Sequence, residues 1–131
     1  MKKPPAERRK SPRIEKSLPL SLTDATFDLA TETKNISARG VYCRVDHHIP
    51  YMSKIMVTLS LPVQEKGRIT HYLIRSRATV VRSESQIINH GKKEIHFVAL
   101  YFEHLKRSDS QKIEEYVRTH LATRPALSSH P

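Results

Sequence analysis

Apolar and polar residues alternate along most of the chain after residue 17. This period of two is typical of strands that bury one face. It occurs in three segments, residues 18–23, 41–45 and 55–61. Two further segments, residues 70–82 and 94–103, carry apolar residues on both faces in places, which indicates strands covered on both sides. The pattern predicts five to seven strands that form an antiparallel barrel or sandwich.

The C-terminal part of the chain changes to helical spacing. Apolar residues recur there along one stripe, at Ile113, Tyr116, Val117, His120 and Leu121. Ser108 and Gln111 have the spacing of a capping box, and Arg124–Pro125 predicts the end of the helix. We therefore expect one amphipathic helix that packs on the outside of the sheet.

Two groups of residues have turn composition, at positions 62–67 and 89–92. The start of the chain is different again, because residues 1–16 hold seven Lys or Arg against two Glu, which is +5 of the total net charge. Three prolines in this segment exclude a long helix. The expected organisation is a flexible basic arm over residues 1–16, a β domain with its closing helix over residues 17–123, and a polar tail over residues 124–131.

The chain is strongly basic. Its 131 residues contain 23 Lys and Arg against 13 Asp and Glu, a formal net charge of +10. A partner should therefore be anionic: nucleic acid, nucleotide, phospholipid head group or acidic protein surface. The single cysteine, Cys43, excludes an intramolecular disulfide and a multi-cysteine zinc site. Because the basic start precedes no apolar export segment and residues 95–102 are too few to span a bilayer, we expect a cytoplasmic protein.

Motifs of catalysis and of metal binding are missing from the sequence. His47 and His48 are neighbours, and neighbouring residues of a strand point to opposite faces. The three glycines are too far apart for a phosphate-binding loop. Cys43 alternates with Val41 and Val45, which favours a buried thiol over a nucleophile. We expect no enzyme activity, no metal and no cofactor.

Two short motifs remain. The first is R-x-x-x-R, formed by Arg9 and Arg13 in the basic arm and preceded by Arg8. Alone it equally describes a solvated basic tail. The second is N-x-S-x-x-G, which begins at Asn35. Alone it equally describes an ordinary turn, although at the start of a strand its Asn and Ser would share one face.

Together, and in this order, the two motifs resemble the PilZ domain family, whose pattern is R-x-x-x-R followed by [DN]-x-S-x-x-G. The resemblance covers the chain from Arg8 to about Leu121. It implies a mainly β fold, a six-stranded antiparallel PilZ-type β-barrel with a flexible N-terminal arm and a C-terminal helix packed on it. It also implies a receptor for the second messenger cyclic di-GMP that acts on motility, attachment, exopolysaccharide or virulence through an unidentified downstream protein.

The resemblance also predicts the ligand-binding residues: Arg8, Arg9, Arg13, Asn35, Ser37, Arg39 and Gly40. The motif arginines would clamp the phosphates or the guanine edges of the ligand, which accept the two-pronged donor of a guanidinium. The Asn and Ser side chains would hydrogen-bond the same groups, and Gly40 would leave space or allow a positive φ. Arg8 and Arg39 add charge, and Arg8 extends the expected stoichiometry to one or two ligands per chain.

Two alternatives stay open at this point. A small basic barrel that binds RNA or DNA needs exposed aromatic residues, whereas four aromatics are expected to pack: Phe97, Tyr101, Phe102 and Tyr116. The other alternative is a PilZ-like protein-interaction module that binds no nucleotide. Arg82 and Ser83 are left out of the predicted site, because polar residues at a strand end are more often solvated.

Overall fold

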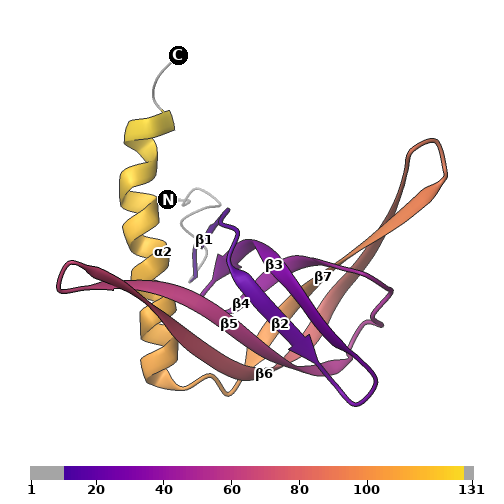
Figure 1. Ribbon diagram of the computed structural model, residues 1–131, viewed down its shortest axis with the longest axis horizontal. Helices are drawn as coiled ribbons and strands as arrows, with labels where there is room; N and C mark the ends of the chain where they lie inside the picture. Colours follow the sequence, from indigo (N-terminus) through magenta and orange to yellow (C-terminus); the bar gives the residue numbers. More distant parts are fainter. Residues whose placement is uncertain (1–10, 129–131) are drawn as a thin grey trace, which may run out of the picture.

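A computed structural model describes residues 11–128 of the chain, and the side chains of residues 11–121. It contains seven strands and one long helix (Figure 1). The elements are β1 (Arg13–Ile14), β2 (Pro19–Thr23), β3 (Asp28–Ser37), β4 (Gly40–Val45), β5 (Lys54–Glu65), β6 (Arg68–Ile88), β7 (Lys93–Glu103) and α2 (Arg107–Ser128).

The strands form one antiparallel sheet that returns on itself. Its order is β1-β3-β2-β5-β6-β7-β4, and a further pairing of β3 with β4 closes strands β2 to β7 into a ring. The short strand β1 is added to β3, where it pairs with Ile36 and Ser37. The mainly β fold predicted from the sequence, with six strands in a barrel-like ring and one C-terminal helix, is confirmed.

Strand β6 connects the two halves of the ring. Its residues 68–79 pair with β5, and its residues 77–88 pair with β7. The β5–β6 hairpin and the β6–β7 hairpin consequently project in opposite directions from the ring (Figure 1). The turn predicted at 89–92 is confirmed, with positive φ angles at Asn89, His90 and Gly91.

The turn predicted at 62–67 is shorter than expected, because residues 62–65 continue β5 and only Lys66 and Gly67 form the turn. Pro62 does not interrupt the strand. Beyond Leu59, β5 pairs with β6 but no longer with β2. One edge of the strand is therefore unpaired at Pro62, and the N–H that proline lacks is not needed there.

The core fills the ring and continues under the helix. Leu22, Leu59 and Ile74 are fully buried inside the ring, and Ile113 and Val117 of α2 are buried where the helix packs against β1 and β3. The predicted apolar stripe of the helix is therefore confirmed. In the part of the chain that the structure describes, no helix combines the length and apolarity needed to cross a membrane.

Both predicted ends of the helix are wrong. The helix begins at Arg107, so Ser108 lies inside the first turn and forms no capping box. Asp109 occupies this turn instead, where the helix dipole favours a carboxylate, and it accepts a 2.9 Å hydrogen bond from the Tyr72 hydroxyl. At the other end, α2 continues past Pro125 to Ser128, since a proline removes one main-chain hydrogen bond without necessarily ending a helix.

Two strands were not predicted. Arg13 and Ile14 were expected in the arm, but they form β1, because Ile14 is buried against the core. Strand β3 escaped the alternation test, since its buried positions include the polar residues Thr33 and Ser37. A bulge between Thr33 and Asn35 also shifts the period of the strand.

The burial of Cys43 leads to a labelling prediction. Cys43 is fully buried, and this burial raises the pKa of its thiol to about 12. The thiolate is the reactive form of cysteine, so the folded protein should react with a disulfide reagent far more slowly than the urea-unfolded protein at the same pH. Absorbance of the released thiol measures both rates. Equal rates would contradict a buried Cys43.

Candidate functional site

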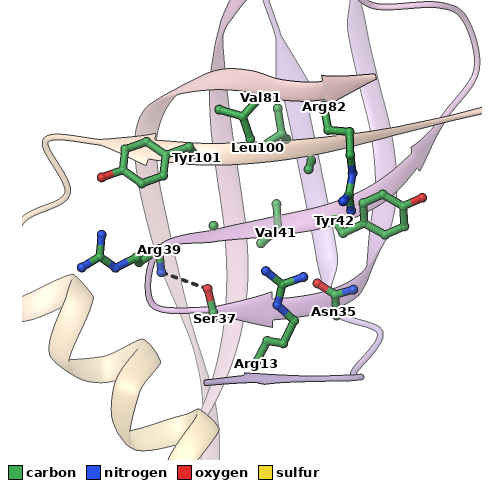
Figure 2. A pocket seen from close by; sticks show the side chains of 12 residues that line it. Arg13, Asn35, Ser37, Arg39, Val41, Tyr42, Val81, Arg82, Leu100 and Tyr101 are labelled. Atoms are coloured by element: carbon green, nitrogen blue, oxygen red, sulfur yellow. Dashed lines mark hydrogen bonds between the residues drawn. The ribbon is translucent and has the colours of Figure 1, made fainter. Parts of the chain in front are cut away.

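A surface cavity of about 240 Å³ lies where β1 and the β3–β4 hairpin face β6 and β7 (Figure 2). Twelve residues line it: Arg13, Asn35, Ser37, Arg39, Gly40, Val41, Tyr42, Val81, Arg82, Ala99, Leu100 and Tyr101. Five of the seven residues predicted from the two motifs are among them. The other two, Arg8 and Arg9, lie outside the residues that the structure describes.

The cavity exists because small residues alternate with large ones across three strands. Gly40 of β4 pairs with Tyr101 of β7, and Ala99 of β7 has Tyr42 on one side and Arg82 on the other. The methyl group of Ala99 and the single hydrogen atom of Gly40 thus lie between three long side chains. The long side chains form walls, and the small residues form the floor.

Gly40 is required by the packing of the strands. A Cβ atom at this position would lie 1.9 Å from the carbonyl oxygen of Leu100, far inside van der Waals contact. Its φ is not positive, unlike those of Gly67 and Gly91. The expected close approach at Gly40 is therefore present, but it is made by the backbone of β7.

The N-x-S-x-x-G motif spans the β3–β4 hairpin. Asn35 and Ser37 lie at the end of β3 and Gly40 begins β4, so the expectation that the motif starts a strand is wrong. The Oγ of Ser37 accepts a 3.1 Å hydrogen bond from the backbone N–H of Arg39, which stabilises the turn. Asn35 and Ser37 both point toward the cavity (Figure 2), and the hydroxyl of Ser37 can still donate a hydrogen bond.

Two arginines bring positive charge to this side of the cavity. The pairing of Arg13 with Ser37 places the Arg13 guanidinium between Asn35 and Ser37 (Figure 2). Arg39 donates from Nε to the Oγ of Ser11 at 3.2 Å. Within residues 11–121, neither Arg13 nor Arg39 forms an ion pair. Their charges therefore remain available to an anion.

The opposite wall was not predicted from the sequence. Val81 and Tyr101 are 46% and 44% exposed, so the expectations of a covered Val81 and a packed Tyr101 are wrong. A bulge between Val80 and Arg82 interrupts the alternation of β6 and brings Val81 to the surface. Consecutive apolar residues in the sequence indicate either a covered strand or a bulge, and here the bulge explains them.

The β4–β5 loop holds this bulge in place. The N–H of Met52 donates to the carbonyl of Val80 at 2.7 Å, and the N–H of Val80 donates to the carbonyl of Ser53 at 2.9 Å. Ser83 donates from its hydroxyl to the carbonyl of Ile49 at 2.8 Å. Ser83 thus fastens the loop to β6 and is absent from the cavity lining, whereas Arg82 lines it.

Tyr42, Arg82 and Glu84 form a connected group at one end of the cavity. The Tyr42 hydroxyl donates to Oε1 of Glu84 at 2.6 Å, and Nε of Arg82 lies 3.3 Å from Oε2 of the same carboxylate. Burial and the hydrogen bond to Glu84 raise the pKa of Tyr42 to about 12. The hydroxyl is therefore protonated at neutral pH, as its role as a donor requires.

The lining suits the binding of an anion. The described residues around the cavity supply guanidinium, amide and hydroxyl groups, and they include no carboxylate, imidazole or thiol. Across the described part of the chain, no three His, Cys, Asp or Glu residues gather as they would around a metal ion. The geometry thus provides hydrogen-bond donors and positive charge on a partly apolar floor.

Comparison with protein families identifies the fold. The model of the PilZ domain matches residues 7–119, which include both motifs and the whole ring of strands. The chain belongs to the PilZ domain family. Among curated proteins, none matches it in sequence.

Solved structures support the same fold. The Bacillus subtilis inhibitor of motility MotI/DgrA superimposes with a TM-score of 0.72 at 22% identity, covering 89% of this chain and 53% of its own. The PilZ domain of Escherichia coli YcgR with c-di-GMP superimposes with a TM-score of 0.63 at 9% identity, covering 95% of this chain and 99% of its own. The K. pneumonia MrkH–c-di-GMP complex superimposes with a TM-score of 0.65 at 14% identity, covering 94% of this chain and 55% of its own. This PilZ domain thus spans about half the length of the MotI and MrkH chains.

The strand contact at Gly40 predicts a large effect of one methyl group. Gly40→Ala should lower the free energy of unfolding by about 3 kcal/mol, because the backbone of β7 cannot move aside without loss of pairing. Gly67→Ala is the control: it meets no atom within 4 Å. Its φ of +77° should cost only about 1 kcal/mol. Urea unfolding followed by circular dichroism measures both, and equal losses would contradict the role of the Gly40 contact.

Proposed function

We propose that this PilZ domain is a receptor for cyclic di-GMP. The observation that supports it most is the position of Arg13, Asn35 and Ser37. These residues come from two motifs about 20 positions apart, and they line one cavity of a PilZ domain. Two of the structural neighbours, YcgR and MrkH, are described as complexes with c-di-GMP.

The chemistry of the cavity suits this ligand. Cyclic di-GMP carries two phosphodiester charges, and Arg13 and Arg39 are cations without ion-pair partners among residues 11–121. A guanidinium donates two parallel hydrogen bonds to a phosphate or to O6 and N7 of guanine. The amide of Asn35 both donates and accepts, as the Watson–Crick edge of guanine requires. The residues around the cavity therefore bind phosphate and base together.

The basic arm completes the proposed site. Arg9 lies four residues before Arg13, and four residues span at most about 14 Å. Because β1 holds Arg13 at the cavity edge, this length of chain allows Arg9 to reach a bound ligand. We propose that the ligand orders this arm against the ring, and that the ordered arm presents a new surface to a downstream protein in the cytoplasm. Arg8 would contact a second, stacked ligand.

Motility is one output that this receptor would control. MotI, which shares the fold, is described as an inhibitor of motility. The downstream protein would bind the ordered arm and not the free one.

Isothermal titration of cyclic di-GMP, with GMP as the control ligand, tests the receptor function. We expect micromolar or tighter binding of cyclic di-GMP and no response to GMP. A stoichiometry of two would support the role of Arg8. Absence of cyclic di-GMP binding would overturn the proposal, and a gel shift on single-stranded RNA or DNA would then favour the nucleic-acid alternative.

Arg13→Ala should weaken cyclic di-GMP binding by about 1.5–3 kcal/mol, the range for hydrogen bonds to a charged group. Arg75→Ala is the matched control, since Arg75 is an exposed arginine of β6 outside the cavity lining. It removes the same net charge but should leave the affinity almost unchanged. Titration calorimetry measures both variants, and equal losses would show that only net charge matters.

Ordering of the arm predicts a change in proteolysis. Residues 1–16 contain seven Lys or Arg, so trypsin should cut the arm readily in the free protein. Saturating cyclic di-GMP should slow these cuts severalfold, while cuts at Lys92–Lys93 in the exposed β6–β7 hairpin keep their rate. Mass spectrometry of timed samples measures each site. Unchanged cutting of the arm by a protein that binds the ligand would contradict the ordering step.

A further inference from the structure

Side chains from three neighbouring strands form a layered stack at one end of the cavity. The rings of Phe97 on β7 and Tyr42 on β4 stack with centroids 5.6 Å apart and planes 22° apart. The Cζ atom of Arg82, from β6, lies 5.3 Å from the centroid of the Tyr42 ring. Strand β7 separates β4 from β6, so Arg82 and Tyr42 meet above the small side chain of Ala99.

Glu84 holds this stack in one arrangement. Its two carboxylate oxygens are engaged separately, one by the Tyr42 hydroxyl and the other by Nε of Arg82. An arginine side chain normally loses much conformational freedom when it binds a ligand. Here that freedom is already restricted by two contacts, so less is lost on binding.

The ion pair also determines which ligand group Arg82 suits. Glu84 offsets the charge of Arg82 and occupies its Nε, so an added phosphate would meet a neutralised guanidinium and a nearby carboxylate. The planar face of the guanidinium remains available, because 55% of the Arg82 side chain is exposed. A planar guanidinium stacks on the face of a base.

We propose that Arg82, held over Tyr42 by Glu84, is the platform on which one guanine of cyclic di-GMP stacks. This inference rests on the proposed receptor function and assigns a role that neither sequence motif contains. Asn35 of β3 pairs with Tyr42 of β4 and lines the same cavity, so its amide is placed to hydrogen-bond the edge of a base on this platform. Arg82 thus contributes affinity through the face of the base, and Asn35 reads its edge.

Substitutions at Arg82 separate stacking from charge. Arg82→Ala should weaken cyclic di-GMP binding about tenfold, within the range for stacking of one base. Arg82→Lys should lose nearly as much, because lysine keeps the charge but has no plane. Arg75→Ala again serves as the matched control. Arg75 lies seven residues before Arg82 on the same strand, roughly 23 Å away along an extended chain.

A double-variant cycle tests the role of Tyr42 as support for Arg82. Tyr42→Leu removes the ring and should weaken binding severalfold. The variant that combines Tyr42→Leu with Arg82→Ala should bind no more weakly than Arg82→Ala alone, because the two residues form one platform. Thermal unfolding of each variant checks that the fold is kept, and calorimetry measures the affinities.

The outcomes distinguish this inference from the receptor function. If the unmodified protein binds cyclic di-GMP and Arg82→Ala binds equally well, the platform is overturned while the receptor function stands. If Arg82→Lys keeps full affinity, charge rather than stacking explains the effect, and the inference is wrong. If the Tyr42 and Arg82 losses add completely, the two residues act independently, and the shared platform is overturned. If the unmodified protein does not bind cyclic di-GMP, the receptor function and the platform are both overturned.

Discussion

The close contact between β4 and β7 at Gly40 is the constraint on which the candidate site depends. The ring closes only if β4 pairs with β3 on one side and β7 on the other. This double pairing brings Gly40, the first residue of β4, so close to β7 that a Cβ atom on it would meet the Leu100 carbonyl. A glycine at this position lets the strands approach, and the β3–β4 hairpin then lies beside β7 with the cavity above them. Strand pairing and binding geometry therefore depend on the same residue.

Charge is distributed unevenly over this frame. The net charge of +10 favours an anionic partner but does not say where the partner binds. Around the cavity, Arg13 and Arg39 keep their charges unpaired in the described part of the chain, whereas Glu84 offsets the charge of Arg82. One side of the cavity thus suits phosphate, and the other suits the face of a base. Such a division fits a ligand that combines both groups, as a cyclic dinucleotide does.

Much of the fold could be predicted because its main strands alternate apolar and polar residues. Strand β3 could not be predicted in this way, since Thr33 is a buried polar residue whose hydroxyl accepts a hydrogen bond from the N–H of Leu18. The helix start was mispredicted for a related reason. Asp109 is buried and accepts a hydrogen bond from Tyr72, a contact 37 positions away that no local capping rule contains. Long-range hydrogen bonds explain both errors.

For the candidate site, the sequence by itself determined the side chains of one wall, because the two motifs supply its arginines, its amide and its hydroxyl. Only the tertiary structure decided the opposite wall. Tyr42 and Arg82 are 40 positions apart and meet only because Ala99, on the strand between them, leaves space above the sheet. Spacing along a chain reports neighbours within one element, whereas contact across three strands depends on their register.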